Sequence, residues 1–147
     1  MNRLLALLFL TAISLHAADL TLTSPIDYQV VQRSSPGKGL LRIAGELSED
    51  VPADAAVQVR LVNNDKPTTW SQGNSVKGRK IIASYEAPAG GWWKVEVQVV
   101  QGGKQLALGS VAHVGIGEVF VIAGQSNSAN HGQEKQTTKS RRVAHRG

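Results

Sequence analysis

Cysteine is absent from the 147-residue chain, which excludes a disulfide scaffold, thiolate metal ligands and a thiol nucleophile. Aromatic residues make up only 5% of the chain, so a core must be built mainly from aliphatic side chains. Hydrophobic residues nevertheless reach 41% and charged residues 18%. This balance supports a packed core rather than disorder throughout. At ~100–200 residues per domain, the length allows one domain with a short extension.

Acidic residues are missing from one end of the chain, and this explains the formal net charge of +5. Residues 135–147 hold five of the 16 lysines and arginines and no acid. With Arg3 also set aside, the rest carries 10 basic and 11 acidic residues. A folded nucleic-acid interface would interleave basic with aromatic residues, and the basic segment has no aromatic residue. We therefore expect no nucleic-acid partner and interpret residues 135–147 as a basic, disordered tail.

Long apolar runs are scarce, and the longest one starts near the N-terminus at residues 4–13. It follows Arg3 and is succeeded by the small residues Ala17 and Ala18. One positive charge, about ten apolar residues and a small-residue exit predict a secretory signal peptide over residues 1–17. The run is shorter than the ~20 residues that a membrane span needs. An uncleaved anchor or a buried N-terminal helix is the alternative. We expect an exported protein, periplasmic or extracellular, without a membrane span.

Helical periodicity is missing from residues 20–116, where apolar and polar side chains alternate with a period of two. The alternation is clearest in residues 57–61 and 94–99, and it is typical of antiparallel strands with one buried and one solvated face. Further predicted strands cover residues 20–23, 28–32, 39–44, 81–85 and 105–111. About seven short strands in ~95 residues predict an immunoglobulin-like β-sandwich over residues 18–116.

Turn residues separate these strands. Breaks fall at residues 35–39, 63–67 and 88–91, and Gly102-Gly103 between two alternating runs predicts a two-residue hairpin. The polar and basic residues 71–80 are interpreted as a solvated hairpin loop. Residues 52–56 can make at most one helical turn.

Trp92 and Trp93 are adjacent at the entrance of a predicted strand, so their side chains should point to opposite faces. We expect one in the core and the other at least partly exposed. The exposed one is interpreted as covering an edge or contacting a second domain. A sugar-stacking platform is the alternative.

The alternating pattern ends at Gly117. Residues 119–123 form a continuous apolar run, which is typical of a strand buried on both faces of a parallel α/β sheet. Gly124 then permits a sharp turn, and Ser126 and Asn127 are good N-cap residues for a helix. The order places a hydroxyl at the carboxyl end of a strand, where α/β sheets bind ligands.

A serine nucleophile for ester hydrolysis needs this order of strand, turn and helix start. The backbone N–H groups and the helix dipole at that position stabilise the negative charge that develops on the substrate. The alternative is that the same residues form a turn that caps a helix and has no catalytic role. The pattern also differs from the Gly-x-Ser-x-Gly elbow of α/β-hydrolases, since Ser128 stands where the second glycine belongs.

The block GEVFVIAGQSN at residues 117–127 closely resembles the first catalytic block of sialate O-acetylesterase-like carbohydrate esterases, which belong to the SGNH (GDSL-type) hydrolase superfamily. By this resemblance Ser126 is the acyl nucleophile and its backbone N–H is one oxyanion donor. Gly124, Gln125 and Asn127 are the other motif residues. The upstream GGWWKVEVQVV stretch more loosely resembles the small β domain that precedes the catalytic domain in some of these proteins.

The resemblance implies that residues 117–134 begin an SGNH-like α/β domain, giving its first strand and the start of a helix after a mainly β domain. It also implies an acetylated carbohydrate substrate and a reaction that needs no cofactor and no metal. The family's oxyanion glycine and asparagine cannot be assigned in this chain.

A catalytic histidine, which in the family commonly follows an aspartate by three residues, also cannot be assigned. The residues three before the four histidines are Ile13, Ser110, Ser128 and Arg142. His131 follows Ser126 by five residues, which on a helix is ~140° around the axis and unsuited to a hydrogen bond between them. We interpret His131 as a surface residue, His113 as structural and His145 as part of the basic tail.

Residues 117–147 number 31, whereas one βαβ unit alone takes ~30 residues. We therefore expect this chain to be an N-terminal fragment of a truncated or interrupted esterase, with little activity alone. A genuine basic tail is the alternative origin of residues 135–147. The second functional hypothesis is a non-catalytic β-sandwich module that binds carbohydrate or docks on a partner domain. The third is an inactive fragment whose apolar segment 119–123 promotes aggregation.

Overall fold

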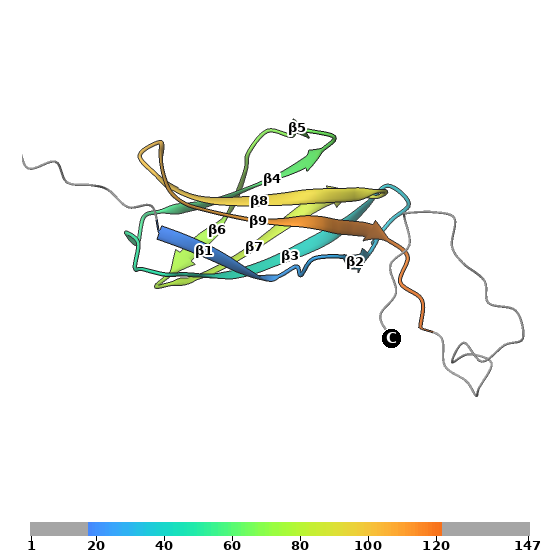
Figure 1. Ribbon diagram of the computed structural model, residues 1–147, viewed down its shortest axis with the longest axis horizontal. Coiled ribbons are helices and arrows are strands. Elements are labelled where there is room, and N and C mark those ends of the chain that lie inside the picture. Colours follow the sequence, from blue (N-terminus) through green and yellow to red (C-terminus); the bar gives the residue numbers. More distant parts are fainter. Residues whose placement is uncertain (1–17, 122–147) are drawn as a thin grey trace, which may run out of the picture.

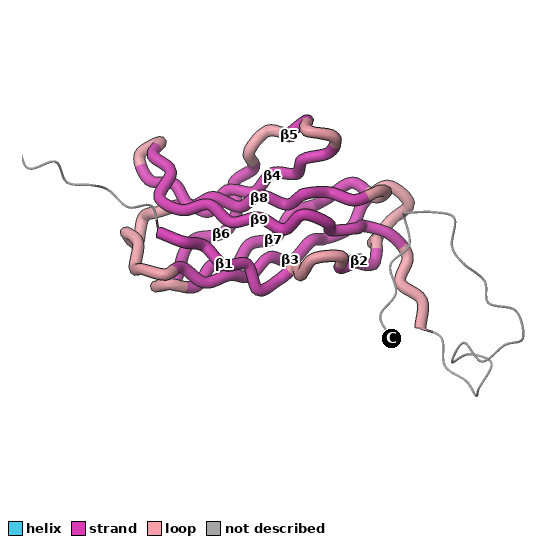
Figure 2. Tube along the Cα trace, viewed as in Figure 1, coloured by secondary structure: helices cyan, strands magenta, loops and turns pink. Residues whose placement is uncertain are grey.

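The computed structural model describes residues 18–121, and within this range every regular element is a strand (Figures 1 and 2). The mainly β fold is therefore confirmed. The strands are β1 (Ala18–Ser24), β2 (Gln29–Gln32), β3 (Lys38–Leu47), β4 (Ala56–Asn63), β5 (Lys66–Pro67), β6 (Ser71–Lys77), β7 (Lys80–Pro88), β8 (Trp92–Gln101) and β9 (Lys104–Gly117).

Hydrogen bonds join the strands in the order β1-β3-β7-β6-β4-β8-β9-β2, with β5 paired to β4. The strands form two layers, one with β4, β8 and β9 and the other with β1, β3 and β7 (Figure 1). Strand β6 pairs with both β4 and β7, and β1 pairs with both β3 and β9. These two strands therefore connect the layers along both edges.

Two of the pairings are parallel, which the alternation pattern did not predict. Strand β9 runs parallel to β1 and to β2, while the remaining pairs are antiparallel. The sheet is consequently mixed. Side-chain alternation reports which face is buried and is the same for both directions, so it cannot distinguish them.

The core fills the space between the layers with aliphatic side chains. Strands β4 and β8 contribute every second residue, as their sequences predict, and β3 and β7 face them. The fully buried side chains include Val57, Val59, Leu61, Val95, Val97, Val99, Leu41, Ile43, Leu47 and Ile81. Burial of this apolar surface is the main favourable contribution to folding.

The predicted Gly102-Gly103 hairpin is confirmed. The two glycines have φ values of 55° and 80° and connect β8 to β9 where Gln101 pairs with Lys104. Two consecutive positive φ angles match the twist of the flanking strands and favour glycine. The turn at residues 63–67 is built similarly, with Asn64 and Asp65 at φ 47° and 60°.

The interpretation of residues 71–80 as a loop is wrong, because most of this segment is strand β6. Its polar sequence lacks clear alternation, and Val76 is its buried hydrophobic side chain. At Gly73 the backbone of β6 lies close to the backbone of β4. A Cβ atom added at Gly73 would lie only 3.0 Å from the Val57 carbonyl oxygen. The turn itself is confined to the residues around Gly78, whose φ is 59°.

The predicted signal peptide at residues 1–17 lies outside the described residues. Across residues 18–121, no helix is long and apolar enough to cross a membrane.

Candidate functional site

The residues predicted to carry catalysis lie outside the described part of the chain. These are Gly124, Gln125, Ser126 and Asn127, together with His131, His145 and the tail at residues 135–147. The structure describes only the beginning of the motif, residues 117–121. These residues lie where strand β9 ends, immediately before the rest of the predicted motif.

Strand β9 ends at Gly117, where it pairs with Gln32 at the end of β2. The next residues were predicted to start a buried strand. The structure assigns no strand to residues 119–121, and the side chains of Val119, Phe120 and Val121 are 50%, 81% and 90% exposed. Because β2 has already ended, no described strand lies alongside to pair with them. The rest of the predicted strand, residues 122–123, lies outside the described residues.

Three side chains interact where the chain leaves β9, and we call Gln32, Arg33 and Glu118 the exit latch. Gln32 Nε2 donates to Glu118 Oε2 at 2.7 Å, and the Arg33 guanidinium forms an ion pair with the other carboxylate oxygen. The Val119 N–H donates to Gln32 Oε1 at 2.7 Å. The Arg33 N–H donates to the Gly117 carbonyl at 2.8 Å. Residues 117–119 are therefore fixed to the end of β2.

The exit latch changes the acidity of its carboxyl group. The hydrogen bond from Gln32, and then that from Arg33, lowers the pKa of Glu118 below its ordinary value. Hydrogen bonds to the ionised form stabilise that form. Glu118 consequently stays ionised to a lower pH than an ordinary glutamate does.

An aromatic cluster lies on the same layer and consists of Tyr28, Trp92 and His113. The Tyr28 and His113 rings are stacked with centroids 4.3 Å apart, and Tyr28 meets Trp92 edge-on at 5.5 Å. Asp27 Oδ1 accepts the His113 backbone N–H at 2.8 Å and lies 3.1 Å from its Nδ1. Tyr28 has φ 59° and a side chain 52% exposed. These contacts fix the position of His113, and its expected structural role stays a prediction.

The two tryptophans divide between the faces as predicted. Trp93 packs against the core, and its indole Nε1 is buried with no hydrogen-bond partner. Trp92 lies over Gly115 on the neighbouring strand, so that a side chain at this glycine would meet the Trp92 ring at 3.1 Å. The same position lies 3.3 Å from Val30.

These contacts define a strip on the outer face of β9. Val114 and Ile116 face inward and are buried in the core, so Gly115 and Gly117 lie on the outer face, where the Trp92 ring covers Gly115 and leaves it buried as well. Val30 of β2 flanks both glycines, since a Cβ atom added at either would lie 3.3 Å or 3.9 Å from it, and Trp92 flanks the first. We call Tyr28, Val30, Trp92, Gly115 and Gly117 the exit strip, because it runs along β9 to the exit latch.

A second polar cluster lies on the outer face of β4 and β8. The Arg60 guanidinium stands 4.3 Å over the Trp70 ring and pairs with Glu96 at 2.6 Å, and Lys94 pairs with the other oxygen of Glu96 at 2.6 Å. The hydrogen bond from Lys94, followed by that from Arg60, lowers the pKa of Glu96 against the opposing effect of burial. Two cations share one carboxylate, so the cluster carries a formal net charge of +1, and each of its three charged groups has an ion-pair partner.

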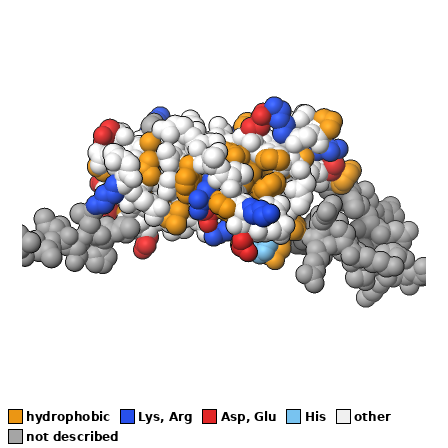
Figure 3. All heavy atoms as spheres, turned by 90° about the horizontal axis from the view of Figure 1, so that it is seen from above, with side chains coloured by type: hydrophobic (Ala, Val, Ile, Leu, Met, Phe, Trp, Pro, Cys, Tyr) orange, Lys and Arg blue, Asp and Glu red, His pale blue; other side chains and the backbone are white. Residues whose placement is uncertain are grey.

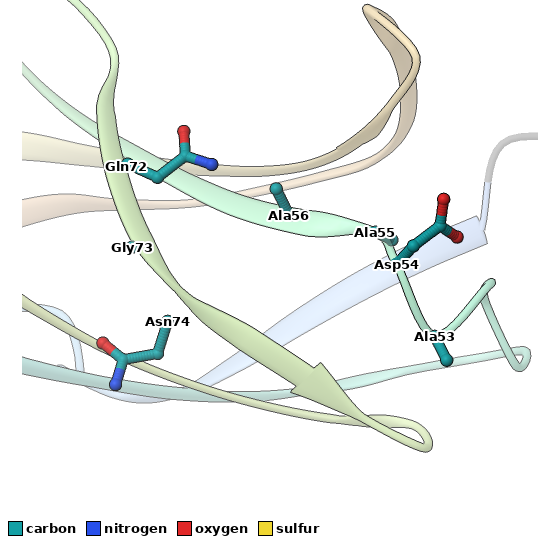
Figure 4. Close-up of a pocket in the computed structure, with 7 residues that line it drawn as sticks. All are labelled: Ala53, Asp54, Ala55, Ala56, Gln72, Gly73 and Asn74. Atoms are coloured by element: carbon teal, nitrogen blue, oxygen red, sulfur yellow. The ribbon is translucent and has the colours of Figure 1, made fainter.

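Two hollows on the described surface are shallow. One, of about 250 Å³, is lined by the turn before β4 and by β6, and Asp54 is its one charged residue (Figure 4). The other, of about 310 Å³, lies over β1 and β3. Neither contains any residue of the latch or strip.

Charged side chains show no concentration of one sign in the view of Figure 3, where blue and red atoms are interspersed with hydrophobic ones. Among residues 18–121, no group of three or more histidines, aspartates or glutamates is placed to hold a metal ion. Compared with known proteins, the chain matches no family model and no curated protein.

Sequence reasoning missed the exit latch. Gln32 and Glu118 are 86 positions apart, and although Glu118 lies in the GEVFVIAGQSN block, nothing in that block points to Gln32. The parallel pairing of β2 with β9 is what brings them together, and that pairing has no local signal.

Proposed function

We propose that this chain is the N-terminal region of an exported serine esterase that removes acetyl groups from carbohydrate. In this proposal the two layers are an immunoglobulin-like β-sandwich, residues 1–17 direct export, and Ser126 is the nucleophile. The observation that carries the proposal is the GEVFVIAGQSN block. It begins at Gly117, where β9 ends and the chain leaves the sandwich.

The chemistry expected of Ser126 is acyl transfer. The general base takes the proton from Oγ as it attacks the acetyl carbonyl, and the carbonyl oxygen becomes an oxyanion held by backbone N–H groups. The protonated base then gives this proton to the sugar oxygen as the C–O bond breaks, so the sugar leaves as an alcohol and the acetyl group stays on Oγ. Water then releases acetate from the acyl-enzyme. The GEVFVIAGQSN block itself supplies neither the base nor the remaining oxyanion donors.

The decisive experiment compares the 147-residue chain with the product encoded when the downstream DNA is included. We expect the longer product to contain a glycine–asparagine block and a late Asp-x-x-His, and to release acetate from O-acetylated sugars. In the longer product Ser126→Ala should reduce kcat by a factor on the order of 10⁴–10⁶. Ser128→Ala is the matched control and should retain activity.

Two results would contradict the proposal. One is an inactive longer product, and the other is equal activity of Ser126→Ala and Ser128→Ala. Rapid acetyl-ester hydrolysis by the 147-residue chain, lost on Ser126→Ala, would instead show that the base is already present.

A non-catalytic carbohydrate-binding module is the second candidate, favoured by the exposure of Tyr28 beside Trp92. Aromatic rings present apolar surface with a polar edge, which suits sugar rings. Titration with acetylated and deacetylated oligosaccharides should then change tryptophan fluorescence. Trp92→Ala should abolish the change, whereas Trp70→Ala should preserve it.

A further inference from the structure

We propose that the free edge of strand β7 is an interaction surface and that its occupant is β7 of a second copy of this chain, paired antiparallel across a two-fold axis. This edge is the backbone of residues 83–88 on the side away from β3, and we call it the β7 edge. The proposal goes beyond the proposed function and does not depend on it.

The pairing of β7 leaves this edge open. On one side β7 pairs with β3 along its whole length, from Lys80 to Pro88. On the other side it pairs with β6 only at Lys80 and Ile81. Strand β6 then crosses to the other layer, where Gln72 pairs with Gln58 of β4 (Figure 1). Within the described part of the chain, β3 and β6 are the strands that pair with β7.

The turn between β6 and β7 shows on which side the backbone groups of β7 lie. Gly78 and Arg79 form a two-residue turn with a positive φ at Gly78, which is the type II′ pattern. In such a turn the Lys80 N–H donates to the Lys77 carbonyl oxygen. The Lys80 N–H therefore points toward β6 and away from β3.

Backbone groups repeat their direction at every second residue of an antiparallel strand. The N–H and C=O groups of Ser84 and Glu86 therefore point to the β7 edge, where the register with β6 has already ended at Ile81. Pro88 agrees with this direction, because proline has no N–H and is tolerated where the nitrogen of a strand residue faces away from its neighbour. The edge thus presents backbone donors and acceptors to which β7 of a second copy can hydrogen-bond.

The β7 edge lacks the features that usually prevent edge strands from pairing, such as lysines, prolines and inward-pointing charges. Residues 83–87 contain no lysine or proline. The inward-pointing side chains are those of Ala83, Tyr85 and Ala87. The outward-pointing Glu86 already forms an ion pair with Lys38 of β3 at 2.8 Å. Residues 18–121 carry ten basic and ten acidic side chains, so net charge does not keep two copies apart.

Two copies of β7 complement each other in one antiparallel register. Side chains keep to matching faces when Ser84 lies opposite Glu86 of the second copy and Tyr85 lies opposite Tyr85. The Ser84 hydroxyl can then donate to the Glu86 carboxylate, and Ile82, which is 62% exposed, lies opposite Pro88. A shift of two residues places Glu86 opposite either Glu86 or the apolar Ile82, which is unfavourable. Each copy contributes the same edge, so the pair is a closed dimer.

Sedimentation velocity of the full chain over a concentration series tests the proposal. We expect the weight-average mass to rise from that of one chain to that of two. Ser84→Pro removes an N–H at the β7 edge and none that faces β3, so it should keep the chain monomeric. Ser84→Glu places a carboxylate opposite Glu86 of the second copy and should also weaken the dimer. Thr23→Glu, at an exposed position of β1, is the matched control and should not.

The absence of cysteine allows a second measurement. Tyr85 would face its own copy in a non-hydrogen-bonded pair, where Cα atoms are ~4.5 Å apart, a distance that a disulfide can bridge. Tyr85→Cys should therefore give a covalent dimer under mild oxidation. Ile82→Cys is the matched control and should not, because the two copies of this residue would lie six positions apart, roughly 20 Å.

Three results would overturn the proposal. One is a chain that stays monomeric up to near-millimolar concentration. Another is a dimer that survives both Ser84→Pro and Ser84→Glu, since a different surface would then be in contact. The third is a mass that grows beyond two copies, which would show open-ended association. Circular dichroism checks that each variant keeps the β fold, and Ser84→Glu carries the test if the proline variant does not fold.

Discussion

At the scale of single residues, one glutamine side chain holds the point where the chain leaves strand β9. Gln32 donates to Glu118 and accepts from the Val119 backbone, each at 2.7 Å. The amide uses both its donor and its acceptor, so neither glutamate nor leucine could replace it. Glutamate would repel the Glu118 carboxylate, and leucine would leave both partners without these hydrogen bonds.

The pH dependence of the exit latch follows from Glu118. Its pKa is lowered first by Gln32 and then by Arg33. A carboxyl group with a lowered pKa in the folded state contributes stability above its unfolded pKa, about 4.3 for glutamate. That stability is lost as the pH falls through the lower folded value. We therefore expect the latch to be closed at neutral pH and to open only in acid.

An NMR titration of the Glu118 carboxyl carbon should accordingly have its midpoint below the ordinary glutamate value. Gln32→Ala should raise this midpoint. The matched control is Gln101→Ala, which removes a glutamine bonded to Asp54 at 2.8 Å in another part of the fold, and it should have no effect. An unchanged midpoint in Gln32→Ala would show that the amide is not the cause of the lowered pKa.

At the scale of elements, alternation decides which neighbours along a strand support the fold. In β3, Leu41 is 1% exposed, whereas the adjacent Leu40 is 47% exposed. Adjacent residues in a strand point to opposite faces, so identical side chains have different energetic roles. Comparing substitutions at these two leucines therefore measures how much burial in the core contributes to stability.

Leu41→Ala should lower the free energy of unfolding by about 2–5 kcal/mol, because it removes buried methyl groups and leaves a cavity. Leu40→Ala should change it by no more than about 0.5 kcal/mol, as expected of a surface substitution. Chemical denaturation followed by circular dichroism measures both. Equal effects of the two substitutions would mean that Leu41 is not in the core.

The β8–β9 hairpin provides a second comparison, between two glycines. Gly102 has φ 55°, whereas Gly37 has no positive φ and open space around its Cβ position. Gly102→Ala should destabilise the protein by about 1–2 kcal/mol, because an L-residue is strained in the left-handed region. Gly37→Ala should be neutral or slightly stabilising. Thermal unfolding measures both variants. Equal shifts of the melting temperature would contradict the prediction that only Gly102 needs a positive φ.

At the scale of the whole molecule, the charge is separated from the fold. Residues 18–121 carry ten basic and ten acidic side chains, so the formal net charge of +5 lies outside them. Retention of the chain on a polyanionic column at neutral pH should therefore depend on residues 135–147 and weaken with salt. Deleting these residues should abolish retention, whereas Lys94→Gln should barely change it. Retention that survives the deletion would place a basic face on the sandwich.

The predictions from sequence succeeded where the signal is local. Residues 57–61 and 94–99 alternate strictly because one face meets the core, and both lie in strands. Gly102-Gly103 forms the expected turn because few other pairs accept two positive φ angles. Residues 71–80 were misassigned because β6 is stabilised by its neighbours β4 and β7 and not by its own polar sequence.

The sequence by itself determined the mainly β composition, the alternating faces, the hairpin glycines and the motif around Ser126, since each depends on residues close together in the chain. Only the tertiary structure decided that β9 runs parallel to β2 and that Gln32 and Arg33 hold Glu118. It also decided that Trp92 lies beside Tyr28 and over Gly115. These contacts join residues far apart in sequence, and the free energy that selects them comes from packing the whole core.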